Sequence, residues 1–229
     1  VESVLSNSYS NSYYYNESIK EEYYGGKILL EENCEYNVKD TIFRKTSPLV
    51  LDLIGDGLEF TSVFNGVNFD LNADGNVELT AWTTFQSEFD NAFLVYDKNN
   101  NGQIDNGKEL FGDQNGAETG FDELKKYDDN DDGVIDELDS IFNKLALWVD
   151  YNKNAVVDAN ELKTLKEAGV TEMQVTFKKQ LDEKGNVTTD ENGNIVGFVG
   201  QFKMMIEGVG EVVRTMIDVF FMTMQNIMS

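Results

Sequence analysis

Five acidic loops punctuated mostly by glycine, between Asp52 and Glu161, constrain this chain more than any other feature. Each begins with Asp, and further oxygen-bearing side chains recur along it. A hard cation such as Ca²⁺ takes about six to eight oxygen ligands at roughly 2.3–2.6 Å, and a short loop can supply them locally. The repetition predicts that bound calcium organises this part of the chain. A diffusely acidic, solvated surface is the simpler alternative, but it would not concentrate Asp at ligand spacings.

The loop that we call loop four has the most complete spacing, with Gly133 at its sixth position and Ile135 at its eighth. We expect helices on both sides of it, which predicts a full EF-hand. Its last ligand is Asp139, where Glu usually gives two oxygens, so Ca²⁺ should bind less tightly or Mg²⁺ compete better. The candidate ligands are Asp128, Asn130, Asp132, Val134 (through its carbonyl), Asp136 and Asp139.

Loop five starts 22 residues later and ends with the expected Glu, but Ala155 replaces glycine at its sixth position. A left-handed conformation there costs about 1 kcal/mol. We expect loops four and five to form an EF-hand pair, with a short β-bridge between Ile135 and Val157. The candidate ligands are Asp150, Asn152, Asn154, Val156 (through its carbonyl), Asp158 and Glu161.

Two further loops are variants of the same pattern. Loop three places its Glu at position 13, so Gly107 is expected to absorb an extra residue. Loop two lies between expected strands. The candidate ligands are Asp97, Asn99, Asn101, Gln103, Asp105 and Glu109 in loop three, and Asp70, Asn72, Asp74, Asn76 and Glu78 in loop two.

Loop one departs from the ligand pattern, because the apolar Ile54 occupies its third position. Asp52 and Asp56 remain as candidate ligands. Asp52 either contributes to such a site, completes another site, or caps a turn. Three to five bound Ca²⁺ are therefore expected over the five loops.

The pattern of apolar residues predicts an α+β fold, with an EF-hand-like calcium-loop module of short helices and strands followed by a small antiparallel β meander. Strands are expected at 49–53, 64–70, 77–82 and 93–96, and helices at 121–127, 140–148 and 160–168. From Val170 the apolar period becomes two, which is typical of strands. Three segments follow: a Tyr-, Ser- and Asn-rich stretch at 1–46, disordered or with weak strands; the calcium module at 47–169; and the meander at 170–229.

Composition excludes several classes of protein. Lys and Arg number 18 against 42 Asp and Glu, so the formal charge is 18 − 42 = −24. This charge repels nucleic acid and anionic membranes. There is no His and a single Cys, Cys34, which excludes the usual zinc and copper sites, His-based catalysis and a disulfide within the chain. No apolar run is long enough to span a membrane, and we expect the chain to be a piece of a longer protein.

Several motifs in this order resemble the calcium-binding modules of RTX-type (hemolysin-type) secreted bacterial proteins, including the self-processing module of iron-regulated RTX proteins. The resemblance covers about residues 47–222, and the matching stretches are 47–59, 97–113, 148–169 and 218–221. It implies a secreted or surface-exposed protein, with export machinery and an unknown surface partner as possible partners.

The resemblance also implies a reaction, in which a Ca²⁺-dependent module cleaves an Asp-Pro bond at its own start through an anhydride. The matching bond here is Ser47–Pro48, and Pro48 is the only proline. A Ser side chain cannot form that anhydride, so we expect no self-cleavage and no enzyme. Ca²⁺-dependent self-processing remains the alternative function. A second alternative is an interaction module of an adhesin or toxin, with Tyr13, Tyr14, Tyr15, Tyr23 and Tyr24 as the contact.

Overall fold

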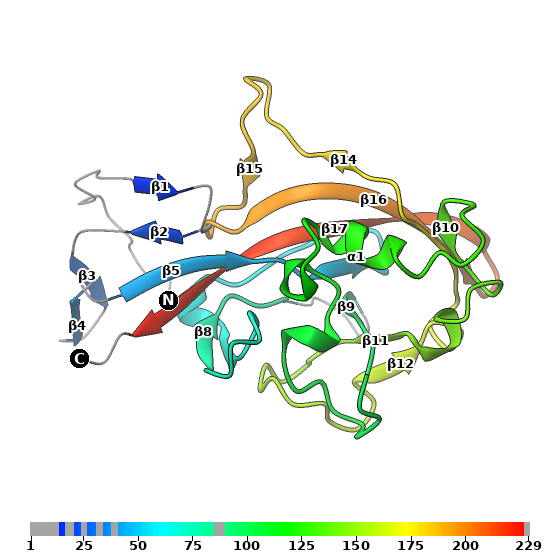
Figure 1. The fold of residues 1–229 in the computed structure, drawn as a ribbon, viewed down its shortest axis with the longest axis horizontal. Helices are drawn as coiled ribbons and strands as arrows, with labels where there is room; N and C mark the ends of the chain where they lie inside the picture. Colours follow the sequence, from blue (N-terminus) through cyan, green and yellow to red (C-terminus); the bar gives the residue numbers. More distant parts are fainter. Residues whose placement is uncertain are drawn as a thin grey trace.

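The structure is a computed structural model, and it describes residues 14–16, 21–23, 27–30, 34–37, 41–84 and 90–226. Most of the regular structure is antiparallel β (Figure 1). One sheet contains fifteen strands, and β3 pairs with β4 in a separate two-stranded sheet. The strands are β1 (Tyr14–Asn16), β2 (Glu21–Tyr23), β3 (Lys27–Leu30), β4 (Cys34–Asn37), β5 (Thr41–Thr46), β6 (Leu49–Asp52), β7 (Val67–Phe69), β8 (Glu78–Thr80), β9 (Asn91–Val95), β10 (Val134–Ile135), β11 (Ala146–Trp148), β12 (Leu162–Thr164), β13 (Val170–Gln174), β14 (Lys178–Lys179), β15 (Thr188–Thr189), β16 (Ile195–Ile206) and β17 (Gly210–Asn226).

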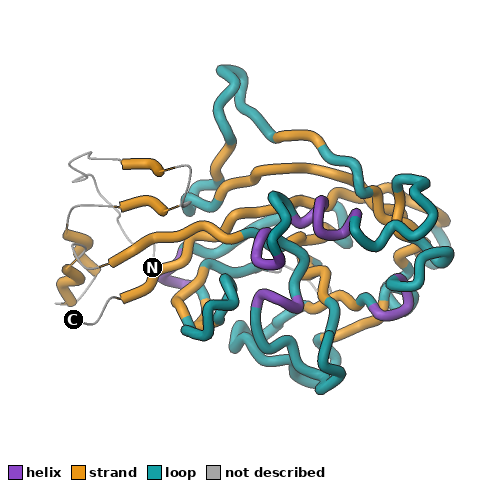
Figure 2. The backbone as a smooth tube through the Cα atoms, in the orientation of Figure 1, coloured by secondary structure: helices purple, strands orange, loops and turns teal. Residues whose placement is uncertain are grey.

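Helix is scarce among the described residues, as the few purple segments of Figure 2 show. Within the described ranges the single α-helix has six residues, and the other helical segments are single 3₁₀ turns. None of these helices is long and apolar enough to cross a lipid bilayer. They are α1 (Gly120–Lys125), η2 (Val63–Asn65), η3 (Gly107–Glu109), η4 (Asp113–Asn115) and η5 (Phe142–Lys144).

The predicted α+β fold with EF-hand helices is therefore wrong. The helix expected at 121–127 overlaps α1, but the one expected at 140–148 is the turn η5 followed by β11, and the one at 160–168 contains β12. The physical reason is burial on two faces. Leu147 and Trp148 are both buried on β11, and they pack into different cores while β11 pairs with β9 and β12.

Strand β17 is the longest strand of the sheet and pairs with β5, β6, β8 and β16. On one side β5 and β6 pair with it in a single register, from Asn226↔Thr41 to Met216↔Leu51. On the other side it pairs with β16 and then with β8. The expected C-terminal meander is thus not a small separate unit, because its longest strand, β17, pairs with strands from the N-terminal part of the chain. Strands β16 and β17 run side by side across Figure 1.

The Ser47–Pro48 bond interrupts the β5–β6 side of this ladder. Pro48 has no N–H to donate, but its carbonyl accepts from Val219 N (3.2 Å) and it forms an isolated bridge with Gly112. Leu49 N donates to Phe111 O (2.7 Å). The bond therefore lies inside the sheet, between β17 and the segment at residues 111–112.

The sheet buries both of its faces. Along β6 and β9 every side chain is buried, and successive residues alternate between two cores, as strand geometry requires. The first core is aliphatic with some Phe. The second contains the aromatic cluster, which we define as Phe69, Trp82, Phe93, Trp148 and Phe221. Ring centroids in this cluster lie 4.6 Å apart for Trp82 and Phe93 and 5.6 Å apart for Trp82 and Trp148.

A substitution at Gly112 can test whether the Ser47–Pro48 bond packs against the segment at residues 111–112. A Cβ added to Gly112 would lie 1.6 Å from Ser47 O, so Gly112→Ala requires the backbone to move. We expect it to lower the free energy of unfolding by about 3 kcal/mol, measured by urea denaturation. The control is Gly116→Ala, which has a positive φ of 75° and no atom within 4 Å of the added Cβ, and should cost about 1 kcal/mol. Equal losses for the two variants would contradict the described contact.

Candidate metal centre

Loops two to five share one backbone frame, set by the Asp at position 1. In each loop its two carboxylate oxygens accept hydrogen bonds from the backbone N–H groups of positions 5 and 6. The distances are 3.0 and 3.0 Å at Asp70, 3.2 and 2.8 Å at Asp97, 3.2 and 2.9 Å at Asp128, and 3.1 and 2.8 Å at Asp150.

The side chains at positions 3 and 5 continue the same pattern. The amide oxygens of Asn72, Asn99, Asn130 and Asn152 each accept from the N–H two residues later, at 2.9–3.1 Å. Asp74, Asn101, Asp132 and Asn154 accept from position 7, where Asn76, Gln103, Val134 and Val156 stand. Position 4 has a positive φ in all four loops, and so does position 6, including Ala155 at 58°.

A buried carboxylate closes three of the loops. Glu109, Asp139 and Glu161 are 5%, 2% and 2% exposed, and each accepts from the N–H groups of positions 2 and 9. Asp139 makes the same two contacts as the longer Glu side chains. In loop three the turn η3 accommodates the extra residue. It brings Glu109, at position 13, to the place that Asp139 and Glu161 occupy at position 12 of their loops. A Cβ on Gly107 would lie 1.8 Å from Leu71 O, so glycine is required there.

Side-chain amides in three loops point at the carboxylate of position 9. Asn72 donates to Glu78 at 2.6 Å, Asn99 to Asp105 at 2.7 Å and Asn152 to Asp158 at 2.7 Å. In loop four Asn130 donates to Asp132, and Asp136 accepts from Leu138 N. These loops gather carboxylate and amide oxygens without nitrogen or sulfur ligands from His or Cys, and that donor set fits a hard divalent cation such as Ca²⁺.

Loop two is shorter, since Glu78 closes it from position 9. Carboxylate oxygens of Asp70, Asp74 and Glu78 lie within 4.8 Å of one another, and Glu78 is 1% exposed. Phe69 pairs with Glu78 across β7 and β8, so this loop connects two strands, as predicted.

Loop one is completed by a residue that sequence reasoning missed. Carboxylate oxygens of Asp52, Asp56 and Asp90 lie within 4.8 Å of one another. Pairing of Asp52 with Asn91, between β6 and β9, brings Asp90 to the loop. Asp52 also caps a turn by accepting from Gly55 N and Gly57 N. The available signal was an acidic residue directly before a buried strand.

The predicted EF-hand pair of loops four and five is wrong. Ile135 pairs with Met173 on β13, not with Val157. Val157 instead meets loop three, through the side chain of Gln103. Ile104 and Val157 belong to the core with the aromatic cluster, whereas Ile135 belongs to the other core. Only loop four follows an α-helix among the described residues; loops three and five each begin two residues after a strand.

Asp150 connects loop five to the aromatic cluster. It is 1% exposed and accepts from Trp82 Nε1 at 2.9 Å. Burial raises the pKa of the Asp150 carboxyl, while hydrogen bonds from Ala155, Asn154 and Trp82 act in the opposite direction. A bound cation would offset the same burial.

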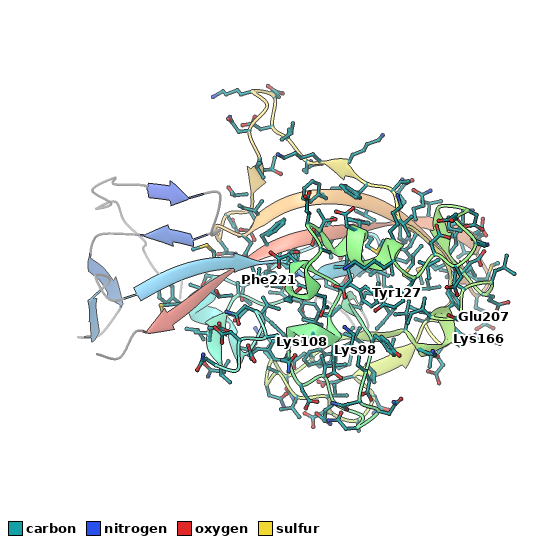
Figure 3. The ribbon with its side chains drawn as sticks, in the orientation of Figure 1. Lys98, Lys108, Tyr127, Lys166, Glu207 and Phe221 are labelled. Atoms are coloured by element: carbon teal, nitrogen blue, oxygen red, sulfur yellow. The ribbon has the colours of Figure 1, made fainter. Side chains whose placement is uncertain are left out.

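Acidic side chains also accept hydrogen bonds from backbone N–H groups near the Ser47–Pro48 bond. Ser47 is fully buried and donates its N–H to Asp113 Oδ1 at 3.1 Å. Gly112 N donates to Glu123 Oε2 at 2.9 Å, and burial raises the pKa of Glu123. Lys98, labelled beside Lys108 in Figure 3, partly offsets this shift from 3.8 Å. Asp218 accepts from Gly120 N at 3.1 Å.

A second repeat, at residues 182–186 and 190–194, forms turns. Asp182 and Asp190 each begin an Asp-Glu-X-Gly-Asn segment and accept from the backbone N–H groups two and four residues later, at 2.8–2.9 Å. The first turn lies in the excursion between β14 and β15 at the top of Figure 1. In the second, Asn194 is fully buried and binds Thr61 O and Met222 N, so its role is structural.

The Trp82–Asp150 contact gives a prediction for the metal-free protein. Trp82→Phe removes the indole donor to a buried carboxylate, which should cost about 1–3 kcal/mol of unfolding free energy beyond the lost packing. Trp148→Phe is the matched control, because Trp148 Nε1 is buried in the same cluster with no hydrogen-bond partner among the described residues. Urea denaturation in chelator measures both, and equal losses would contradict the role of the Trp82 N–H.

Comparison with known proteins places the chain in a family. It is 38% identical over 150 residues to the iron-regulated protein FrpA of Neisseria meningitidis serogroup C, an alignment that covers 62% of this chain and 13% of that relative. The chain therefore spans only a small part of FrpA. The SPM domain model matches residues 49–221, starting directly after Pro48. Because this match covers well over half of the sequence, the chain belongs to the SPM domain family.

Proposed function

We propose that this chain is a calcium-binding module of a secreted or surface-exposed bacterial protein, and that Ca²⁺ bound at several loops drives its folding. The observation that carries the proposal is the common frame of loops two to five. Each Asp at position 1 is already oriented by two backbone N–H groups, and oxygens from positions 3, 5 and 9 lie around the same loop. We expect three to five ions.

The carboxylates hold the metal, and the metal supplies the positive charge that the folded chain lacks. Buried or half-buried carboxylates repel one another in a chain with a formal charge of −24. Binding to the folded state alone stabilises it by about 2.7 kcal/mol per site at a hundredfold ligand excess. Several such sites together rival the roughly 5–15 kcal/mol of a whole domain.

This dependence suits a protein that leaves the cell. Where free Ca²⁺ is low the chain would stay loose enough to pass an export channel, and millimolar Ca²⁺ outside would then fold it. The similarity to FrpA and the resemblance to RTX proteins support this location. Export machinery and a surface partner remain predictions.

Calorimetric Ca²⁺ titration of metal-stripped protein, with circular dichroism alongside, tests the proposal. We expect heat at or below millimolar Ca²⁺ and a thermal midpoint that rises with free Ca²⁺. Asp128→Asn should weaken one site about tenfold, because it removes a ligand charge. Asp131→Asn, in the same loop at non-ligand position 4, removes the same charge and should leave that site nearly unchanged. Absence of heat, together with a fold that chelator does not alter, would sink the proposal.

We also propose that the chain does not cleave itself. Ser47 has a hydroxyl where the family reaction described above uses a carboxylate, and it is fully buried within the sheet. After incubation with millimolar Ca²⁺ the 25.9 kDa chain should stay intact on a denaturing gel. A new fragment ending at Ser47, identified by mass spectrometry, would instead support the self-processing alternative.

The interaction alternative depends on the Tyr-rich segment. Tyr13 and Tyr24 lie outside the described residues, and of the others only the backbone placement in β1 and β2 is described. It stays a prediction, testable by deleting residues 1–46 and measuring binding to a candidate cell surface.

A further inference from the structure

Loop three contacts loop five through the side chain of Gln103. Gln103 Nε2 donates to Val157 O at 3.1 Å, and Val157 N donates to Gln103 Oε1 at 3.1 Å. The side-chain amide thus meets both backbone groups of Val157, as a neighbouring strand residue would. It replaces the β-bridge that joins the two loops of an EF-hand pair.

Gln103 also belongs to the frame of its own loop. It stands at position 7, its N–H donates to Asn101 Oδ1 at 2.8 Å, and its carbonyl is the expected ligand. The next residue, Ile104, is 3% exposed and packs in the core of the aromatic cluster. A cation that fixes the main chain of Gln103 therefore also fixes the origin of its side chain.

Loop five has features that weaken its own binding conformation, so a contact from another loop can stabilise it. Ala155 holds a φ of 58° without the freedom of glycine, and positions 3 and 5 are both uncharged Asn. Val157 lies between the position-7 carbonyl of Val156 and Asp158, which accepts from Asn152 and Asn154 at 2.7 and 2.8 Å. Holding Val157 in place therefore fixes the direction of two expected ligands.

We propose that Gln103 is a positioning residue that couples Ca²⁺ binding at loop three to Ca²⁺ binding at loop five. The inference rests on the proposed function. Occupation of loop three orders Gln103, whose amide then holds loop five in its binding conformation. Coupling between two sites is reciprocal, so occupation of loop five strengthens loop three by the same factor.

The other loops provide internal controls. Loop four is anchored through the pairing of Ile135 with Met173, in the other core. In loop two, Asn76 also stands at position 7 with a side-chain amide, but its Nδ2 donates to Asp74 Oδ1 within the same loop, at 2.9 Å. Asn76→Ala is therefore the matched control for Gln103→Ala. Both changes leave the ligating backbone carbonyl in place.

Site-resolved Ca²⁺ titration of the ¹⁵N-labelled protein measures the coupling. The amides of Gly102, Gly133 and Ala155 report on loops three, four and five. In the otherwise unchanged chain, Asp97→Asn weakens loop three about tenfold, and through the coupling it should weaken loop five by up to about fivefold. In a Gln103→Ala background the same change should leave loop five unaltered. Gln103→Glu retains the acceptor for Val157 N and should keep part of the coupling.

The outcomes separate the coupling from the function. If Asp97→Asn leaves loop five unchanged while the amides of both loops still respond to Ca²⁺, the coupling is wrong and the calcium function stands. The same holds if Asn76→Ala abolishes the coupling as fully as Gln103→Ala. If the loop amides do not respond to Ca²⁺, the function and the coupling both fail. Gly133 should titrate alike in every variant, which shows that the fold is kept.

Discussion

The rest of the structure depends on the antiparallel ladder between β17 and the β5–β6 segment. One register runs from Thr41 to Leu51, and only the missing N–H of Pro48 interrupts it. Loops one, two, three and five each follow a strand of the sheet that contains this ladder, whereas loop four follows α1. Loop one follows β6 directly, and β9, which leads to loop three, pairs with β6. The acidic loops thus connect strands of the sheet. They can face solvent while the side chains on both faces of the strands are buried.

Charge is the second constraint. Closing carboxylates such as Glu161 and Asp139 are almost fully buried, and each is held by two backbone N–H groups. Backbone donors reduce the cost of burying a carboxylate but do not neutralise it. The raised pKa of Asp150 shows burial prevailing over the donors. Under the proposed function, this balance would let loops that are arranged in advance of binding still favour a cation.

The sequence predicted the turns of the acidic loops and the strands around them, because these depend on neighbours within about a dozen residues, but two of the three predicted helices were wrong. The turns at Gly75, Gly102 and Gly133, the strands β6, β7, β8 and β9, and the role of Gly107 all follow from local spacing. The pairing of distant segments did not. Asp90 reaches loop one only through the β6–β9 register, and Gln103 meets Val157 over 54 residues. The apolar residues at 141–148 fit a helix equally well until β9 supplies a partner strand.

The ladder also sets the order in which the chain can acquire structure. Leu49 pairs with Asp218, which lies 218 − 49 = 169 residues further along the chain. The β6–β17 pairing can therefore form only after this long segment is closed into a loop. Closing so long a loop carries a large entropic cost and slows folding. All five acidic loops lie within the intervening segment. Ions that order them one after another would shorten the unstructured chain between the two strands, so metal would act on the rate of folding as well as on its end point.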